Sequence, residues 1–135
     1  MNRRIAPVLV ALLVAPCSRD RGEARREVWV ADRGDGRVHR LGADLGSLAS
    51  ARCGGWPRVV AALPGGGAWA ACGRGPEPSD PFDLVRIGPD GALLATGGPV
   101  GWVADLASGE EGGAWVADRG RGLLVRVRAD GGVLE

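Results

Sequence analysis

The feature that most constrains this chain is a sequence unit that occurs three times. The stretches VWVADRGDGRVHRLGADLG from Val28, AWAACGRG followed by DLVRIGPDGA from Ala68, and AWVADRGRGLLVRVRADGG from Ala114 align with one another. The coinciding residues are Trp29, Trp69 and Trp115; Arg40, Arg86 and Arg126; and Asp44, Asp90 and Asp130. The tryptophans are 40 and 46 residues apart, too long for a solenoid repeat of about 20 to 30 residues. The spacing instead fits a four-stranded unit.

Turn signals divide each unit into short apolar runs. The 24 glycines and 9 prolines disfavour helix interiors and supply the backbone geometry of tight turns. Breaks such as DRGDG, PGGG, GPDG and ADGG separate eleven expected strands, and no segment after residue 26 has a helical pattern. The expected strands are 28–31, 37–41, 47–51, 58–63, 68–72, 84–87, 92–95, 101–106, 114–117, 123–127 and one near Val133.

The two faces of these strands indicate how the sheets pack. In the WVAD-type strands both alternating sets of side chains are apolar, which predicts strands covered on both faces. In the third strand of the units, arginine alternates with apolar residues over 84–87 and 125–128, which predicts one face toward solvent or a polar seam. Inner strands buried on both faces and half-exposed outer strands are typical of radially packed blades.

The repeat resembles the NHL-type β-propeller repeat and the related bacterial propellers that include streptogramin lyases. The matching runs are WVADRG at 29–34 and at 115–120, with Pro57 or Pro99 at the head of a strand. The resemblance covers about residues 27 to 135 and implies an all-β fold, with blades that are antiparallel four-stranded meanders. The second unit departs from the pattern, because Cys72 stands where Asp32 and Asp118 stand in the others.

Eleven strands make just under three blades, whereas propellers close with about four to eight. The ring is therefore expected to be incomplete, with an uncovered apolar face at each end of the row of blades. Two explanations remain open. Either copies of the chain form a homo-oligomer through these open faces, or the chain is a fragment of a longer propeller or a truncated copy.

Residues 1–17 are predicted to be a signal peptide, because Arg3 and Arg4 precede the apolar run 5–15. The residues before Cys17 resemble a bacterial lipobox, except that Pro16 stands where a small residue is expected. Cys17 is thus a candidate lipidation site, and the alternative is an apolar segment that is never cleaved. Residues 18–26 are predicted to be a polar tether, and 27–135 the partial propeller. Export places the protein in the periplasm, on the outer membrane through a lipid anchor, or outside the cell.

The charge balance and motifs argue against several function classes. A net charge of +1 gives no field that would gather nucleic acid or an anionic membrane surface. No nucleophile elbow, phosphate-cradling loop or HExxH run is present. The resemblance to streptogramin lyases implies a histidine with acidic partners around a metal, but His39 is the single histidine, lies on an outer strand and aligns with Val85 and Val125. We therefore expect no catalytic residue, metal or cofactor, and expect Asp32 and Asp118 to cap turns.

Cys53 and Cys72 are expected to form a disulfide. The strands 58–63 and 68–72 form a hairpin across PGGG, which brings both cysteines to one edge. In an exported chain such a bridge would close a loop of about twenty residues and stabilise the fold by roughly 3 kcal/mol. The alternative is two buried small hydrophobic side chains.

The loop 73–83 is the predicted binding feature, because it is six residues longer than its counterparts and emerges on a rim of the blades. The predicted rim residues are Arg33, Asp35, Glu77, Asp80, Phe82, Asp83, Arg119 and Arg121. An idle insertion held extended by three prolines is the alternative. We thus expect an exported, non-catalytic binding or structural module for a protein or a small extracellular ligand. A fragment of a lyase-like or lactonase-like propeller enzyme, or a non-functional copy, is the alternative.

Overall fold

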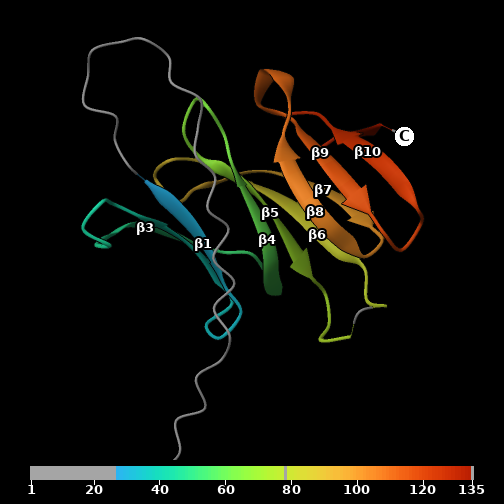
Figure 1. The fold of residues 1–135 in the computed structure, drawn as a ribbon, viewed down its shortest axis with the longest axis horizontal. Helices are drawn as coiled ribbons and strands as arrows, with labels where there is room; N and C mark the ends of the chain where they lie inside the picture. Colours follow the sequence, from blue (N-terminus) through green and yellow to red (C-terminus); the bar gives the residue numbers. More distant parts are fainter. Residues whose placement is uncertain (1–26, 78, 135) are drawn as a thin grey trace, which may run out of the picture.

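The computed structural model describes residues 27–77 and 79–134, which form three antiparallel sheets of consecutive strands (Figure 1). The first sheet contains β1 (Val28–Asp32), β2 (Arg37–Leu41) and β3 (Ser47–Arg52). The second contains β4 (Trp56–Ala62), β5 (Ala68–Gly73), β6 (Phe82–Ile87) and β7 (Leu93–Val100). The third contains β8 (Val103–Ser108), β9 (Ala114–Asp118), β10 (Leu123–Val127) and β11 (Val133–Leu134). In each sheet the strands pair in chain order.

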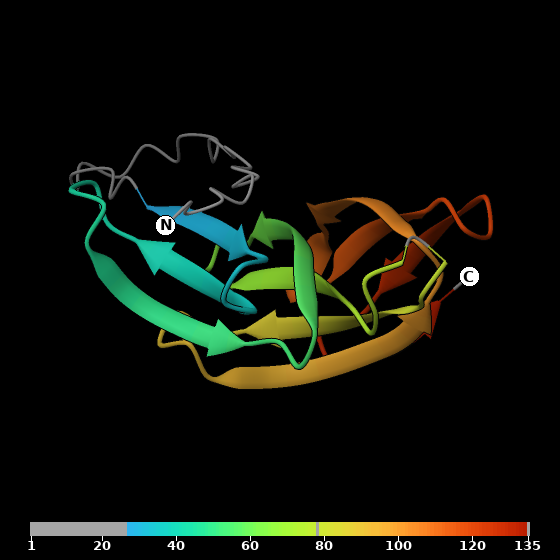
Figure 2. The ribbon, with the colours of Figure 1, turned by 90° about the horizontal axis from the view of Figure 1, so that it is seen from below.

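The sheets stand side by side and pack face to face. Figure 2 shows β1, β4 and β8 along one side of the molecule and β3 and β7 along the opposite side. One core cluster lies between the first and second sheets, around Trp29, Val38 and Val85. A second cluster lies between the second and third sheets, around Trp69 and Val116. The second sheet therefore has a core on each of its two faces. This arrangement follows from strands that carry apolar residues on both faces.

The aligned aspartates form the same turn in every sheet. Asp44, Asp90 and Asp130 each accept a hydrogen bond, at 2.9, 3.0 and 2.8 Å, from the backbone N–H two residues later. Gly131, which follows Asp130, has φ +92°, and a Cβ there would strike the carbonyl oxygen of Thr96 in β7. Aspartate therefore closes the turn, and the glycine lets it approach the outer strand of the preceding sheet.

The structure confirms the all-β class and the eleven expected strands. Of the three WVAD-type strands, β1, β5 and β9, which were expected to be covered on both faces, only β5 is. All six positions of β5 are buried. In β9, Trp115 is 41% exposed, and in β1 Val28 and Val30 are only half-buried. The reason is position, since β5 lies between two sheets, whereas β1 and β9 each have a described sheet on one face only.

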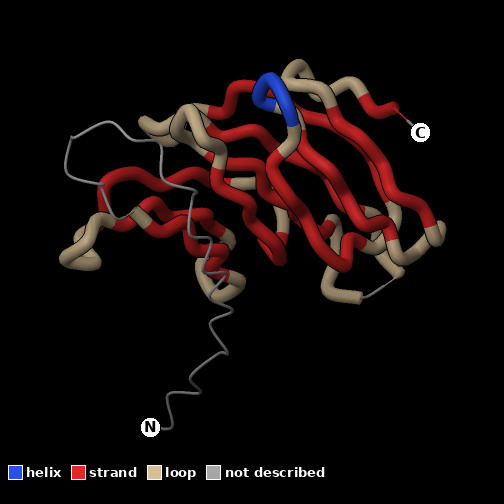
Figure 3. Tube along the Cα trace, turned by 45° about the horizontal axis from the view of Figure 1, so that its top comes forward, coloured by secondary structure: helices blue, strands red, loops and turns tan. Residues whose placement is uncertain are grey.

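Two smaller expectations were wrong. Pro99 does not begin an inner strand, because it lies near the end of β7, an outer strand where a missing N–H is tolerated. Residues Glu110–Gly112 form a single 3-10 turn, η1, at the end of the sheets opposite to the loop between β5 and β6 (Figure 3).

The predicted signal peptide, the predicted lipidation site Cys17 and the predicted tether 18–26 lie outside the described residues. No helix formed by the described residues is long enough and apolar enough to cross a membrane.

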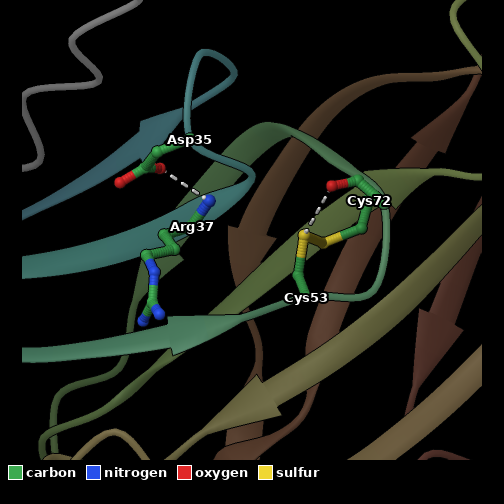
Figure 4. Close-up of a disulfide and its surroundings, with 5 residues drawn as sticks. Asp35, Arg37, Cys53 and Cys72 are labelled. Carbon is green, nitrogen blue, oxygen red and sulfur yellow. Dashed lines mark hydrogen bonds between the residues drawn. A yellow bond between two sulfur atoms is a disulfide. The ribbon is translucent and has the colours of Figure 1, made fainter.

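A disulfide joins Cys53 to Cys72 (Figure 4). Cys53 lies in the connection from β3 to β4, and Cys72 lies in β5 opposite Pro57. Figure 4 shows the bridge beside the β1–β2 turn, where Asp35 accepts a hydrogen bond of 2.9 Å from the N–H of Arg37. The bridge fixes the connection between the first two sheets to the buried strand of the second.

Candidate functional site

The turns β1–β2, β5–β6 and β9–β10 lie at one end of the three sheets (Figure 1). We call the described residues of these turns, 33–36, 74–77, 79–81 and 119–122, the rim. The rim contains most of the residues predicted for binding. The structure does not gather them into one site, because they divide into a self-contained loop, a turn around His39 and a cluster around Trp102.

The long loop satisfies its own charges. Arg74 donates to both carboxylate oxygens of Asp83, at 2.9 and 2.7 Å, and this hydrogen-bonded ion pair raises the pKa of Arg74. Asp80 accepts a hydrogen bond of 2.9 Å from the N–H of Glu77. The side chain of Glu77 is exposed. The loop is therefore a folded insertion whose aspartates are already engaged.

Phe82 is not a rim residue. It is the first residue of β6, is 2% exposed and belongs to the core between the second and third sheets. The sequence contained the signal for this placement, because Phe82 and Leu84 are two residues apart and share one face of the strand.

Arg33 and Asp35 are exposed in the β1–β2 turn. The ring Nε2 of His39 lies 2.9 Å from Asp35, and ligand atoms of Asp32, Asp35 and His39 all lie within 4.8 Å of one another. Asp32 also accepts a hydrogen bond of 2.7 Å from the N–H of Gly34, the capping role expected for it. Three ligand atoms are fewer than the six to eight oxygens of a calcium site. The sequence had indicated packing for His39 and not this pairing.

Asp118 organises the β9–β10 turn from within. It is 1% exposed and accepts hydrogen bonds from the N–H of Gly101 at 2.8 Å and from the N–H and Nε of Arg121 at 3.0 and 2.7 Å. Burial acts to raise the pKa of Asp118. The hydrogen bonds from Arg121 and from the N–H of Gly101, together with the positive charge of Arg121, outweigh burial and hold the pKa below its ordinary value. Asp118 thus joins the turn to the connection before β8.

Two arginines lie over Trp102, next to this turn. The guanidinium carbon of Arg119 is 4.6 Å from the ring centroid of Trp102, and that of Arg58, from β4, is 5.1 Å away. The N–H of Arg119 donates to the carbonyl oxygen of Trp102 at 2.7 Å, which fixes the turn against the indole. Within residues 27–77 and 79–134, neither guanidinium has a carboxylate in ion-pair range, and the buried Nε1 of Trp102 has no hydrogen-bond partner. We call Arg58, Trp102 and Arg119 the Trp102 cluster.

Sequence reasoning named Arg119 but missed Arg58 and Trp102. A usable signal was present, since Gly55-Trp56 and Gly101-Trp102 repeat with the same spacing of 46 residues as Trp69 and Trp115. The contribution of Arg58 was not readable, because it comes from the neighbouring sheet.

Comparison with solved structures identifies the architecture. Streptogramin B lyase superimposes with a TM-score of 0.64 at 12% identity, over 94% of this chain and 38% of that one. The described fold is β-propeller-like. Virginiamycin B lyase from Staphylococcus aureus matches with a TM-score of 0.61 at 13% identity, over 80% of this chain and 36% of that one. A protein of unknown function from Bacteroides caccae matches with a TM-score of 0.56 at 14% identity, over 81% and 40%.

Each sheet is therefore one propeller blade, and the chain spans about two-fifths of the length of these structures. No family model matches the sequence, and the search of curated proteins gave no match. The similarity supports the predicted resemblance to streptogramin-lyase-like propellers at the level of fold.

Proposed function

We propose that this chain is an exported, non-catalytic propeller module that binds a small anionic ligand at its rim. The observation that carries the proposal is the Trp102 cluster, in which two guanidinium groups approach one indole and have no carboxylate partner among the described residues. Two cations beside one indole, without a described carboxylate partner, make the local potential positive, and a positive potential attracts an anion. The cluster thus favours a carboxylate or phosphate ligand.

The chemistry of the cluster supports this ligand class. Guanidinium groups donate pairs of parallel hydrogen bonds to carboxylates and phosphates, and these charge-assisted bonds are stronger than neutral ones. The Arg119 backbone is held by the carbonyl of Trp102, and the turn behind it is held by Asp118. A turn fixed before binding reduces the entropy lost when the ligand is held. Trp102 itself is half-buried and packs against the core between the second and third sheets, which holds the indole in place.

Calorimetric titration of citrate and of inorganic phosphate into the full chain at low ionic strength tests the proposal. Arg119→Ala and Arg58→Ala should each weaken binding about tenfold or more, because a hydrogen bond to a charged group contributes about 1.5 to 3 kcal/mol. Arg33→Ala is the matched control, since Arg33 has the position of Arg119 in the first repeat. Binding should also weaken as salt rises. Equal losses in all three variants, or none in Arg119→Ala, would contradict the proposal.

A propeller enzyme is the second candidate function, favoured by the fold similarity to lyases. One of the solved neighbours is a catalytically inactive H270A form of virginiamycin B lyase with quinupristin. The group in this chain that comes nearest to such chemistry is His39 with Asp32 and Asp35. Incubating the full chain with quinupristin and following its conversion by mass spectrometry separates the candidates. We expect no conversion, and conversion that is lost in His39→Ala would favour the enzyme.

A further inference from the structure

The three aligned tryptophans point toward the following sheet in the chain. Trp29 packs in the core between the first and second sheets and is 6% exposed, and Trp69 packs between the second and third and is fully buried. Trp115 has the same position in the third sheet, and it is 41% exposed. The described residues contain no sheet on the side of the third sheet that Trp115 faces.

The whole face around Trp115 repeats a face that is buried in the second sheet. Cross-strand pairing places Leu124 beside Ala117, as it places Leu84 beside Ala71. Leu84 is fully buried, whereas Leu124 is 66% exposed. Leu134, opposite Arg126, is 42% exposed. We call this surface, formed by Trp115, Ala117, Leu124, Arg126 and Leu134, the third-sheet face.

Each internal interface also repeats one hydrogen bond. Arg40 donates from the first sheet to the carbonyl oxygen of Pro89 in the second, at 2.7 Å. Arg86 donates from the second sheet to the carbonyl oxygen of Ala129 in the third, at 3.2 Å. Pro89 and Ala129 each precede the aligned aspartate of the turn. Arg126 has the position of Arg40 and Arg86, but its guanidinium lies 5.9 Å from the Trp115 ring and 3.8 Å from Glu110.

The first sheet carries the residue whose carbonyl oxygen would accept the third hydrogen bond of this series, from Arg126. Ala43 precedes Asp44 in the first sheet, as Pro89 and Ala129 precede Asp90 and Asp130. The outward face of the first sheet carries Val28 and Val30, which are half-buried and have no described sheet beyond them. One copy of the chain thus offers the donor face, and a second copy offers the matching acceptor face.

We propose that two copies of this chain join head to tail, with the third-sheet face of each packed on the outward face of the first sheet of the other. Arg126 of one copy then donates to the carbonyl oxygen of Ala43 in the other. Two copies bring six sheets into one ring, within the range of about four to eight blades at which propellers close. A two-fold axis relates the two contacts, since Arg126 of each copy meets Ala43 of the other, and assembly stops at two copies because the ring closes.

The new interface differs from the internal ones at its outer edge. Leu45, with φ 63°, has the position of Gly91 and Gly131. Those glycines let their turns reach the backbone of the preceding outer strand. Leu45 has a side chain where those turns have none, so the contact between copies is not expected to repeat this close approach.

Sedimentation equilibrium of the full chain tests the assembly. The expected mass is twice 13.9 kDa. Leu124→Glu should raise the dissociation constant about tenfold or more, because it places a charge in the buried part of the interface. Leu94→Glu is the matched control, since Leu94 is 56% exposed on β7 of the middle sheet and belongs to neither face. A monomeric wild type, or equal losses in both variants, would overturn the proposal.

A mixing experiment tests the head-to-tail direction. Val30→Glu alters the outward face of the first sheet and should, like Leu124→Glu, weaken the dimer of identical copies. An equimolar mixture of the two variants retains one unaltered interface and should recover a dimer. No recovery, or a Val30→Glu protein that dimerises like wild type, would overturn the head-to-tail arrangement. A circular dichroism melt of each variant shows whether the monomer has kept its fold.

Discussion

Trp69 and Trp115 have the same position in consecutive repeats but different environments, so truncating each should have very different costs. Trp69 is fully buried, and its Nε1 donates to the carbonyl oxygen of Gly112 at 2.9 Å. Trp69→Ala should therefore reduce the free energy of unfolding by about 3 to 5 kcal/mol through the lost burial of the ring and the cavity it leaves. The carbonyl of Gly112 left without a donor adds about 1 kcal/mol or more.

Trp115→Ala should cost about 1 kcal/mol or less in the monomer. The ring is 41% exposed, and its contact with Arg126 is a cation–π interaction at a solvent-accessible site. The chemical change is identical in the two variants, so the difference measures what the covering sheet contributes to Trp69.

Urea unfolding followed by far-ultraviolet circular dichroism gives both values. Both variants should be made in the Val30→Glu background, so that loss of a dimer does not enter the comparison and the face around Trp115 stays unaltered. Costs that agree within about 1 kcal/mol would refute the reasoning, because the two tryptophans would then be packed alike.

Three further outcomes are expected. Because the pKa of Asp118 is lowered in the fold, ionised Asp118 stabilises the fold above the ordinary pKa of an aspartate. This stabilisation is lost as pH falls through the lowered pKa. The difference in free energy of unfolding between wild type and Asp118→Asn, measured by urea titration, should therefore become smaller toward acid pH. Replacing both Cys53 and Cys72 by Ser should lower the free energy of unfolding by about 3 kcal/mol, measured without reductant, since the bridge closes a sequence separation of 19 residues. If the leader is processed as a lipoprotein, mass spectrometry of the membrane fraction should show a chain that begins at a lipid-modified Cys17, whereas an unprocessed chain would contradict export by this route.

The strands and their order could be predicted from the sequence because the residues that define them are close together in the chain. Glycine-rich turns and alternating apolar residues fix where each strand begins and ends, and the three aligned units fix the grouping into sheets. The proximity of Cys53 and Cys72 followed from one hairpin in the same way. These features depend on residues that are neighbours in the chain.

The site was less readable because its contacts cross between sheets. Arg58 reaches Trp102 from the preceding sheet, and no spacing within one unit indicates this. The exposure of Trp115 was also missed, because a repeat gives every unit the same pattern whether or not a neighbour covers it. Phe82 directly follows the long loop in the chain, but its two-residue spacing from Leu84 places it on the core face of β6.

Nuclear magnetic resonance of the five indole N–H groups tests directly whether an anion binds at the Trp102 cluster. During a titration with citrate, we expect a saturable shift of the Trp102 signal, because the guanidinium groups of Arg58 and Arg119 lie 5.1 and 4.6 Å from the centroid of its ring. The signal of Trp69, bonded to Gly112 in the core, should remain unchanged. An unchanged Trp102 signal, or equal shifts of all five, would contradict an anion site at Trp102.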